Sequence, residues 1–352
     1  MDSIPLLERL KEKVEAIEDQ LQQVIPKIVE DGWAKKQSGH DLNSISPELW
    51  QRISEPARDL LGRGGKRWRP LFMLLCAEMY GEWQLALPLT PMVEIAHNGS
   101  LIVDDIEDSA VQRRGAEAQH IKFGMDLALN AGNLMYFLAA RAIDAASFSE
   151  EQKLLLHRCY VEDMVRLHLG QGLDILWHRD HENIPSEEQY REMCHLKTGS
   201  LSRLAARAGI IAIGGEKQIA ARLGSIAEDF GACFQIIDDV KNLRMGVPGK
   251  QRGDDIIEGK KSLPVILYLN RYPEARSKIR DSFQIAGGDE SEAAWSAVDE
   301  LITLITPSGC LEEAEQRASA LLQETKGRFQ EIATASTARD QLMELVDLLI
   351  TG

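Results

Sequence analysis

Apolar residues recur every three or four positions along most of this chain, a period that predicts α-helices. Residues 1–34 carry such a stripe between charges, so we expect one amphipathic packing helix, or two broken at Pro26. Residues 116–230 show helix after helix with short glycine or proline breaks and no strand or hairpin pattern. Residues 310–350 are typical of an amphipathic helical pair. The pattern therefore predicts an all-α protein.

Composition narrows the class of protein. With 352 residues, 44% hydrophobic and 27% charged, the chain is typical of a soluble globular protein that can bury a large core. No apolar stretch is long enough to predict a membrane span. The net charge of −15 argues against a nucleic-acid binder, whose surface should be basic. Five scattered cysteines and an N-terminus without a signal-peptide pattern predict reduced thiols and a cytoplasmic location.

The most informative stretch is an apolar run that ends in three aspartates, Leu101-Ile-Val-Asp-Asp-Ile-Glu-Asp108. In a helix, Asp104 and Asp108 lie one turn apart on the same face, and Asp105 lies about 100° round from Asp104. Like charges this close repel each other, so helix stability does not explain them. A magnesium ion does, because Mg²⁺ prefers oxygen ligands and often takes one or two carboxylates plus substrate phosphates.

A partial copy of this motif follows far downstream, in Phe234-Gln-Ile-Ile-Asp-Asp-Val-Lys-Asn242. Asp238, Asp239 and Asn242 repeat the i, i+1, i+4 spacing of the first motif. Two such turns facing each other would form an acidic, cation-filled mouth for a polyphosphate.

A segment rich in arginine and glycine, Gly62-Arg-Gly-Gly-Lys-Arg-Trp-Arg-Pro70, precedes an apolar helical run. Its four cations suit anion capture together with the amides of a helix N-terminus. A basic surface loop explains the same segment equally well. It is not a Walker loop, because G-x-x-x-x-G-K-[ST] is absent.

Further candidates flank the first aspartate motif on the same predicted helix. His97 lies two turns before Asp104 on nearly the same face, which favours a phosphate contact over a purely structural role. Arg113 and Arg114 follow, and Gly115 is expected to end the helix. These arginines either complement the helix dipole or act as forked donors to a diphosphate.

Three more segments carry polar groups between helical runs. Gly170-Gln-Gly-Leu-Asp174 puts Gln171 and Asp174 on one helix face, and Lys197-Thr198 adds a cation and a hydroxyl. Either of these two segments, taken by itself, could have no functional role. The glycine-rich stretch from 249 to 264, which follows the second aspartate motif, is predicted to be a lid bearing phosphate-binding lysines rather than a solvated loop.

Taken in order, these motifs resemble the trans-isoprenyl (polyprenyl) diphosphate synthases. Residues 104–108 resemble the family's first D-D-x-x-D motif and 234–242 its second. The remaining matching motifs are Gly65-Lys-Arg67, Arg113-Arg-Gly115, Gly170-Gln171, Lys197-Thr198 and Gly259-Lys260. The resemblance implies a single polyprenyl synthetase domain over 1–352, with an isoprenoid synthase-type helical bundle around a deep central cavity, usually as a homodimer.

The resemblance also implies an activity, the Mg²⁺-dependent head-to-tail condensation of isopentenyl diphosphate with an allylic diphosphate. The allylic diphosphate ionises, the double bond of isopentenyl diphosphate attacks the cation, and a proton is lost. An apolar cavity would exclude water that otherwise quenches the cation. No protein nucleophile is implied.

By resemblance, each motif residue has an expected role. Mg²⁺ is bound by Asp104, Asp105, Asp108 and Asp238, with Asp239 as a further or supporting ligand. The allylic diphosphate is bound by Arg113, Lys197, Lys250 and Lys260, and Gln171 belongs to the substrate site. Isopentenyl diphosphate is bound by Gly65, Lys66, Arg67, His97 and Arg114. Thr198 and Gln235 lie close to the reacting carbons, where their dipoles stabilise the cation.

Two departures bear on this assignment. Asn242 replaces the last aspartate of the second motif and carries no charge, and Asn133 stands where the family usually has aspartate. In this family, bulky residues four or five positions before the first aspartate stop chain growth early. Here Ser100 and Gly99 are small, which favours geranylgeranyl diphosphate (C20) or a longer product.

Two other functions fit parts of the pattern. A non-catalytic partner subunit of a prenyl synthase should have lost aspartates of the first motif, and all three remain. A terpene cyclase has no need of a second diphosphate site, which the cations around residues 65–67 would form. An autonomous synthase is therefore the favoured prediction.

Overall fold

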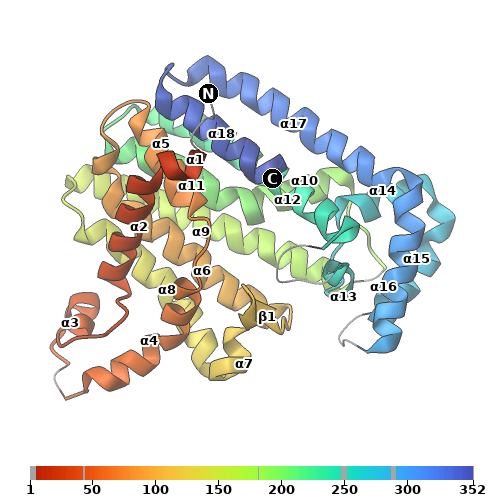
Figure 1. Cartoon of the computed structure of the whole chain (residues 1–352), viewed down its shortest axis with the longest axis horizontal. Coiled ribbons are helices and arrows are strands. Elements are labelled where there is room, and N and C mark those ends of the chain that lie inside the picture. The colour runs from red at the N-terminus through yellow and green to blue at the C-terminus, as the bar shows by residue number, and fades with distance from the viewer. Residues whose placement is uncertain (1–4, 43, 181, 247–251, 287–290, 352) are drawn as a thin grey trace. The chain divides into compact units, whose positions relative to one another are not determined.

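The computed structural model describes residues 5–42, 44–180, 182–246, 252–286 and 291–351. Within these ranges nearly every element is a helix, which confirms the all-α fold (Figure 1). The contacts divide the chain into two compact units. The first comprises Met1–Glu162, Leu204–Gly224 and Ala333–Val346, and the second Asp163–Arg203, Ser225–Ile332 and Asp347–Gly352. A single domain over 1–352 stays a prediction.

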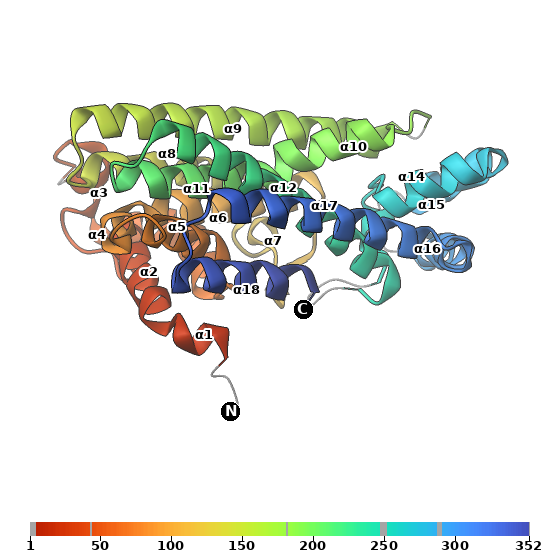
Figure 2. The same ribbon diagram turned by 90° about the horizontal axis from the view of Figure 1, so that it is seen from above.

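The first unit begins with the expected N-terminal helices, interrupted around Pro26. Its helices are α1 (Leu6–Arg9), α2 (Lys11–Val24), α3 (Trp33–Ser38), α4 (Pro47–Gly62), α5 (Trp68–Glu78), α6 (Thr90–Glu107), α7 (Gln119–Phe123) and α8 (Met125–Ala145), with short 3₁₀ turns at Trp83–Leu85 and Leu87–Leu89. Residues 71–77 of α5 are all buried, so this helix forms the centre of the core. Helices α6 and α8 lie side by side along most of their length (Figures 1 and 2).

Two glycines explain why α6 and α8 approach so closely. A Cβ atom at Gly99 would lie 2.9 Å from the Cβ of Met135 and 3.0 Å from the carbonyl oxygen of Gly132. A Cβ atom at Gly132 would in turn lie 2.8 Å from Val103. Only glycine fits at these positions without displacing a neighbour. Helix packing therefore accounts for the small residue at 99, and its size says little about product length.

The segment after the first aspartate motif differs from the prediction. Helix α6 ends at Glu107, and the chain forms a small hairpin in which β1 (Gln112–Arg113) pairs antiparallel with β2 (Ala116–Glu117). The turn residues Arg114 and Gly115 have φ angles of 53° and 74°, as a type I′ turn requires. The expectation that Gly115 ends the helix is therefore wrong, because this glycine serves a hairpin turn.

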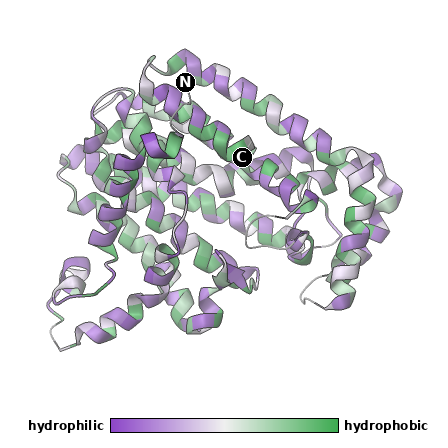
Figure 3. Ribbon diagram, in the orientation of Figure 1, coloured by the Kyte–Doolittle hydropathy of each residue, from purple (hydrophilic) through white to green (hydrophobic). Residues whose placement is uncertain are grey.

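Four helices run through both units: α9 (Glu150–Arg179), α11 (Ser200–Ala212), α12 (Lys217–Arg244) and α18 (Thr337–Thr351). Helix α9 has 30 residues and is the long helix seen from above in Figure 2. Green and purple segments alternate along most helices in Figure 3, as expected for helices with one apolar face. None of the helices in the described ranges is both long and apolar enough to cross a membrane.

The remaining helices belong to the second unit. They are α10 (Glu187–Cys194), a π-helical turn (His195–Gly199), α13 (Asp254–Ile257), α14 (Leu263–Arg271), α15 (Arg276–Ala286), α16 (Glu292–Ile305) and α17 (Cys310–Ile332), with short 3₁₀ turns at Pro273–Ala275 and Thr306–Ser308. Their apolar faces share one core that includes Tyr190, Ile256, Ile266, Phe283 and Leu301. All five cysteines of the chain are buried, and none forms a disulfide in this structure.

Candidate functional site

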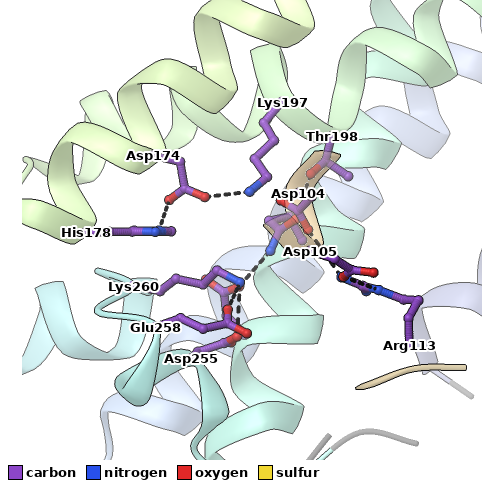
Figure 4. A network of polar contacts seen from close by, with 12 residues as sticks. Asp104, Asp105, Arg113, Asp174, His178, Lys197, Thr198, Asp255, Glu258 and Lys260 are labelled. Atoms are coloured by element: carbon purple, nitrogen blue, oxygen red, sulfur yellow. Dashed lines mark hydrogen bonds and ion pairs between the residues drawn. The ribbon is translucent and has the colours of Figure 1, made fainter. Parts of the chain in front are cut away.

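The first aspartate motif lies at the end of α6, in the first unit, and Asp108 directly follows the helix. Asp104 and Asp108 are partly exposed, and Asp105 is fully buried. Arg113, from β1, donates from Nε to Oδ1 of Asp105 at 2.7 Å and from Nη2 to Oδ2 of Asp104 at 3.4 Å (Figure 4). The structure thus brings Asp104, Asp105 and Arg113 together, and it gives Asp105 a buried ion pair with Arg113.

This motif suits a cation whose coordination shell is completed by a bound ligand. Asp104 and Asp108 offer hard carboxylate oxygens one helical turn apart, the donor type that Mg²⁺ prefers. Across the described part of the chain, no three His, Cys, Asp or Glu side chains gather into a ready-made metal site. Two carboxylates leave most coordination positions of a Mg²⁺ ion to other ligands or water.

A second cluster of the first unit surrounds Arg67 and shows what this arginine does. Arg67 is 3% exposed, and its guanidinium donates to Glu18 of α2 (Nε–Oε1, 2.7 Å) and to Glu94 of α6 (Nη1–Oε1, 2.8 Å). It also donates to the carbonyl oxygen of Leu61 at 2.9 Å. Burial acts to lower the pKa of Arg67, but the two glutamates outweigh it and raise the pKa. Arg67 is thus held inside the protein by two carboxylates.

Arg69, which the sequence interpretation did not assign, lies on the first turn of α5 beside His97. Its Nη1 lies 3.2 Å from Nε2 of His97. Because an arginine can only donate, this His97 nitrogen must accept, and the ring must be neutral. Burial lowers the pKa of His97 well below its ordinary value, and the neighbouring Arg69 and Arg114 lower it further. Burial also lowers the pKa of Arg69, to about 10.

Arg114 and Gly65 complete this cationic cluster. Arg114 donates from Nη1 to the carbonyl oxygen of Leu60 at 3.2 Å, to Oδ1 of Asn98 at 3.0 Å and to the carbonyl oxygen of Gly64. Gly65 has a φ of 147°, and a Cβ there would lie 3.3 Å from both Nη2 of Arg114 and Nη1 of Arg67. The arginines can approach the loop because this residue has no side chain. Lys66 is exposed beside them.

The second unit holds the other predicted residues on α9, the π-helical turn, α12 and the segment before α14. Lys197 donates to Oδ2 of Asp174 at 2.6 Å, and Nε2 of His178 lies 2.8 Å from Oδ1 of the same carboxylate (Figure 4). Burial acts to raise the pKa of Asp174, but Lys197 and His178 outweigh it and hold the pKa well below its usual range. Gln171 lies one turn earlier on α9 and is half-buried.

The π-helical turn is fixed from two sides by glycines. A Cβ at Gly170 of α9 would lie 2.4 Å from the backbone nitrogen of Lys197. A Cβ at Gly231 of α12 would lie 2.7 Å from the Cα of Gly199. Both neighbouring helices therefore touch the backbone of this turn directly, and they leave Lys197 and Thr198 little freedom to shift. Such turns are frequent at functional sites.

Thr198 and the second aspartate motif are joined by hydrogen bonds. Thr198 donates to Oε1 of Gln235 at 2.6 Å, and Gln235 donates from Nε2 to Oδ1 of Asp239 at 2.8 Å. Tyr190 donates to Oδ2 of Asp239 at 2.6 Å. Burial raises the pKa of Asp239 to about 7, and the charge of Asp255 contributes. Asp238, the preceding residue, is partly exposed.

The last predicted residues lie near the expected lid. Lys260 pairs with Glu258, and its Nζ lies 3.5 Å from Oδ1 of Asp255 (Figure 4). Lys261, which was not predicted as functional, is 3% exposed, and its Nζ lies 4.1 Å from the ring centroid of Phe283. The expected diphosphate ligand Lys250 lies outside the described residues.

Comparisons with known proteins match most of this chain. The family model of polyprenyl synthetases matches residues 50–301. A geranylgeranyl pyrophosphate synthase of Rhodocybe pseudopiperita is 35% identical over 299 residues, which cover 81% of this chain and 83% of that protein. A geranylfarnesyl diphosphate synthase of Aeropyrum pernix is 31% identical over 315 residues, 87% of this chain and 95% of its own length.

A solved structure is similar over nearly the whole chain. The crystal structure of a geranylgeranyl pyrophosphate synthetase from Pyrococcus horikoshii superposes with a TM-score of 0.83 at 28% sequence identity. The match covers 99% of this chain and 98% of that one.

Proposed function

We propose, since this chain belongs to the polyprenyl synthetase family, that it is a prenyltransferase that condenses isopentenyl diphosphate with an allylic diphosphate. The product is a trans-polyprenyl diphosphate, geranylgeranyl diphosphate (C20) or longer. The observation that carries this proposal is the family match over residues 50–301, which spans both aspartate motifs. The named synthases of Rhodocybe pseudopiperita and Aeropyrum pernix support a product of this length class.

The family is generally Mg²⁺-dependent, and the donor chemistry of this chain fits that ion. We assign Mg²⁺ binding to Asp104, Asp108 and Asp238, which are partly exposed carboxylates. When bound, Mg²⁺ supplies positive charge to the leaving diphosphate. Asp105 and Asp239 were also expected as ligands. We instead assign them to the buried contacts that they make, Asp105 with Arg113 and Asp239 with Gln235 and Tyr190.

We assign isopentenyl diphosphate binding to Lys66, Arg69, His97 and Arg114, with Gly65 leaving the space they need. Arg69 replaces the expected Arg67, because Arg67 is already neutralised by Glu18 and Glu94. Neutral His97 offers its remaining N–H as a donor without adding a charge to the four nearby arginines. This arrangement binds an anion through fixed donors whose own repulsion the diphosphate relieves.

The allylic diphosphate is assigned to Arg113, Lys197, Lys260 and Lys250, and Gln171 is assigned to the substrate site. In this structure Lys197 pairs with Asp174, and Lys260 pairs with Glu258. These carboxylates hold the lysines in place until a diphosphate, which carries more charge, competes for them. Thr198 and Gln235 stabilise the allylic cation through their dipoles.

We further propose that the enzyme is a homodimer that uses one face of α9. Five apolar side chains on this face are more than half exposed: Leu154, Val161, Val165, Leu169 and Leu176. At about 100° per residue they fall within one narrow stripe of the helix. A stripe of this kind is typical of a protein interface. Val165→Glu combined with Leu169→Glu should turn the dimer into a monomer in sedimentation experiments, whereas an unchanged mass contradicts the proposed face.

A cytoplasmic location is also part of the proposal. It is supported by the five buried cysteines, none of which forms a disulfide.

Incubation with labelled substrate tests the activity. Purified protein with Mg²⁺ and labelled isopentenyl diphosphate is given dimethylallyl, geranyl or farnesyl diphosphate, and the products are dephosphorylated and sized. Products of C20 or longer support the proposal, and a halt at C15 contradicts the product class. Asp104→Asn should abolish incorporation, while Glu107→Gln on the same turn serves as the matched control. No incorporation by folded wild-type protein would favour the partner-subunit alternative.

A further inference from the structure

A continuous chain of hydrogen bonds links Thr198 to the second aspartate motif. Tyr190 and Gln235 both donate to Asp239, at 2.6 Å and 2.8 Å, and Gln235 accepts from Thr198 at 2.6 Å. Tyr190 is 1% exposed and Asp239 4%, so both lie inside the protein. The two carboxylate oxygens of Asp239 are therefore each held by a side chain of the second unit.

The helices that carry these hydrogen-bonded side chains pack tightly against each other. Gln235 and Asp239 lie one turn apart on α12, and Thr198 lies on the π-helical turn. The glycine contact between Gly199 and Gly231 brings this turn against the backbone of α12. Tyr190 belongs to α10, which leads directly into the turn. The hydrogen-bonded groups thus have few ways to rearrange, and the chemistry of each group decides which way its bond runs.

That direction follows from what each group can donate. Both oxygens of Asp239 accept hydrogen bonds, because Tyr190 donates to Oδ2 and Gln235 turns its amide nitrogen towards Oδ1. Its carbonyl oxygen then faces Thr198, and the Thr198 hydroxyl must donate its proton to it. The two lone pairs of the Thr198 oxygen are left pointing away from Gln235. An oxygen in this state presents the negative end of its dipole to whatever lies on its other side.

This direction matters for a reaction that develops positive charge on carbon. A hydroxyl free to rotate would point its proton or its lone pairs towards the cation according to chance, and it would have to reorient during the reaction. A hydroxyl whose proton is already committed needs no reorientation, which is the basis of electrostatic stabilisation by preorganised dipoles.

We propose that Asp239 is a positioning residue that fixes the direction of the Tyr190–Asp239–Gln235–Thr198 hydrogen bonds, so that Thr198 presents its lone pairs to the allylic cation. This inference rests on the proposed prenyl transfer and adds to it a role for Asp239 other than metal binding. Asp238 is the residue of the pair that we assign to Mg²⁺.

A swap of the acidic and amide groups tests the direction itself. In Asp239→Asn, residue 239 gains an N–H donor, so Gln235 can turn over and offer its own N–H to Thr198. In the double variant Asp239→Asn with Gln235→Glu, a carboxylate at position 235 again accepts from Thr198, and the amide introduced at position 239 donates to that carboxylate. The double variant keeps the charge of the pair and all its hydrogen bonds, but moves the carboxylate by one turn.

The measurements are kcat, KM for both diphosphates and the Mg²⁺ concentration at half-maximal rate, with folding checked by circular dichroism. We expect Asp239→Asn to lower kcat by on the order of a hundredfold, with little change in either KM or the Mg²⁺ requirement. The double variant should recover at least about tenfold of this loss. Asp238→Asn serves as the contrast, because it should raise the Mg²⁺ requirement.

The proposal is overturned if Asp239→Asn regains its rate at high Mg²⁺, since that result makes Asp239 a metal ligand. It is also overturned if the double variant is no faster than Asp239→Asn. The double variant decides the matter even where the single variant folds poorly. Failure of prenyl transfer itself is distinct, because then the wild-type protein forms no product with any primer.

Discussion

The two arginines of the Lys66-Arg-Trp-Arg69 segment should differ sharply in what they do, although the sequence presents them alike. We compare Arg67→Met with Arg69→Met, since methionine keeps much of the volume of either side chain and removes the charge. Arg67 makes ion pairs with Glu18 and Glu94, whereas Arg69 lies against His97 and near Arg114. We expect the first change to affect mainly stability and the second mainly substrate binding.

The structure sets the size of the first effect. Glu94 is 3% exposed, and its Oε1 lies 2.8 Å from Nη1 of Arg67. Removing the arginine leaves this carboxylate buried without its cation, a change that costs about 3–5 kcal/mol when a buried ion pair is broken. Asn98 still donates to Glu94 at 3.0 Å, so the lower part of this range is expected. For a typical domain this is a large fraction of the free energy of unfolding.

Arg69→Met should weaken substrate binding and leave stability intact. Burial lowers the pKa of Arg69 to about 10, so the protein holds this charge at a cost in the absence of an anion. Arg69→Met should therefore leave the free energy of unfolding unchanged or raise it. A hydrogen bond to a charged group contributes about 1.5–3 kcal/mol, so kcat/KM for isopentenyl diphosphate should fall by about ten- to 150-fold.

Urea unfolding and steady-state kinetics on both variants check these expectations. Glu94→Gln combined with Arg67→Met is the control, because it removes the buried charge together with its partner and should restore part of the stability. If Arg67→Met is as stable as the wild type and instead raises KM for isopentenyl diphosphate, our assignment of the two arginines is reversed.

Three further predictions follow from the same unit. Gly99→Ala should lower the free energy of unfolding by about 1–3 kcal/mol through overpacking between α6 and α8, without shortening the product; a shorter product from a stable variant would contradict this. Ser100→Phe is the contrast: its position is half-buried and free of that glycine contact, so it should shorten the product, as sized by chromatography. His97 is neutral when folded, whereas in the unfolded chain it takes up a proton below about pH 6.5. Stability should therefore fall as the pH drops below that value, and less so in His97→Gln; equal slopes in urea unfolding at several pH values would refute it.

The sequence predicted the helices and the aspartate motifs because both depend on local spacing. Asp104 and Asp108 lie about one turn apart at the end of α6, since the local helical spacing fixes that relation. The difference between Arg67 and Arg69 could not be predicted. It depends on Glu18, which is 49 residues from Arg67, and on Glu94, which is 27 residues away.

The pattern of apolar and polar residues could not predict two other features of the structure, for physical reasons. The hairpin at residues 112–117 is too short for an alternating apolar signal, although Arg114-Gly115 supplies the turn. Gly99 was interpreted as leaving space for a substrate, but a glycine gives the same signal whether it borders a cavity or a neighbouring helix. Only the position of α8 distinguishes the two.

The π-helical turn at His195–Gly199 has a consequence for how this chain tolerates insertions and deletions. Such a turn holds one residue more than an α-helical turn of the same height. Deleting one residue here would allow α10 and α11 to join in regular helix, because the wider turn accommodates the extra residue, and the side chains within the turn would change direction. Lys197 and Thr198 would then lose their present directions towards Asp174 and Gln235, although no polar residue had been substituted. Chain length at this point is therefore as restricted as the identity of the polar residues, whereas an exposed loop can absorb a change in length.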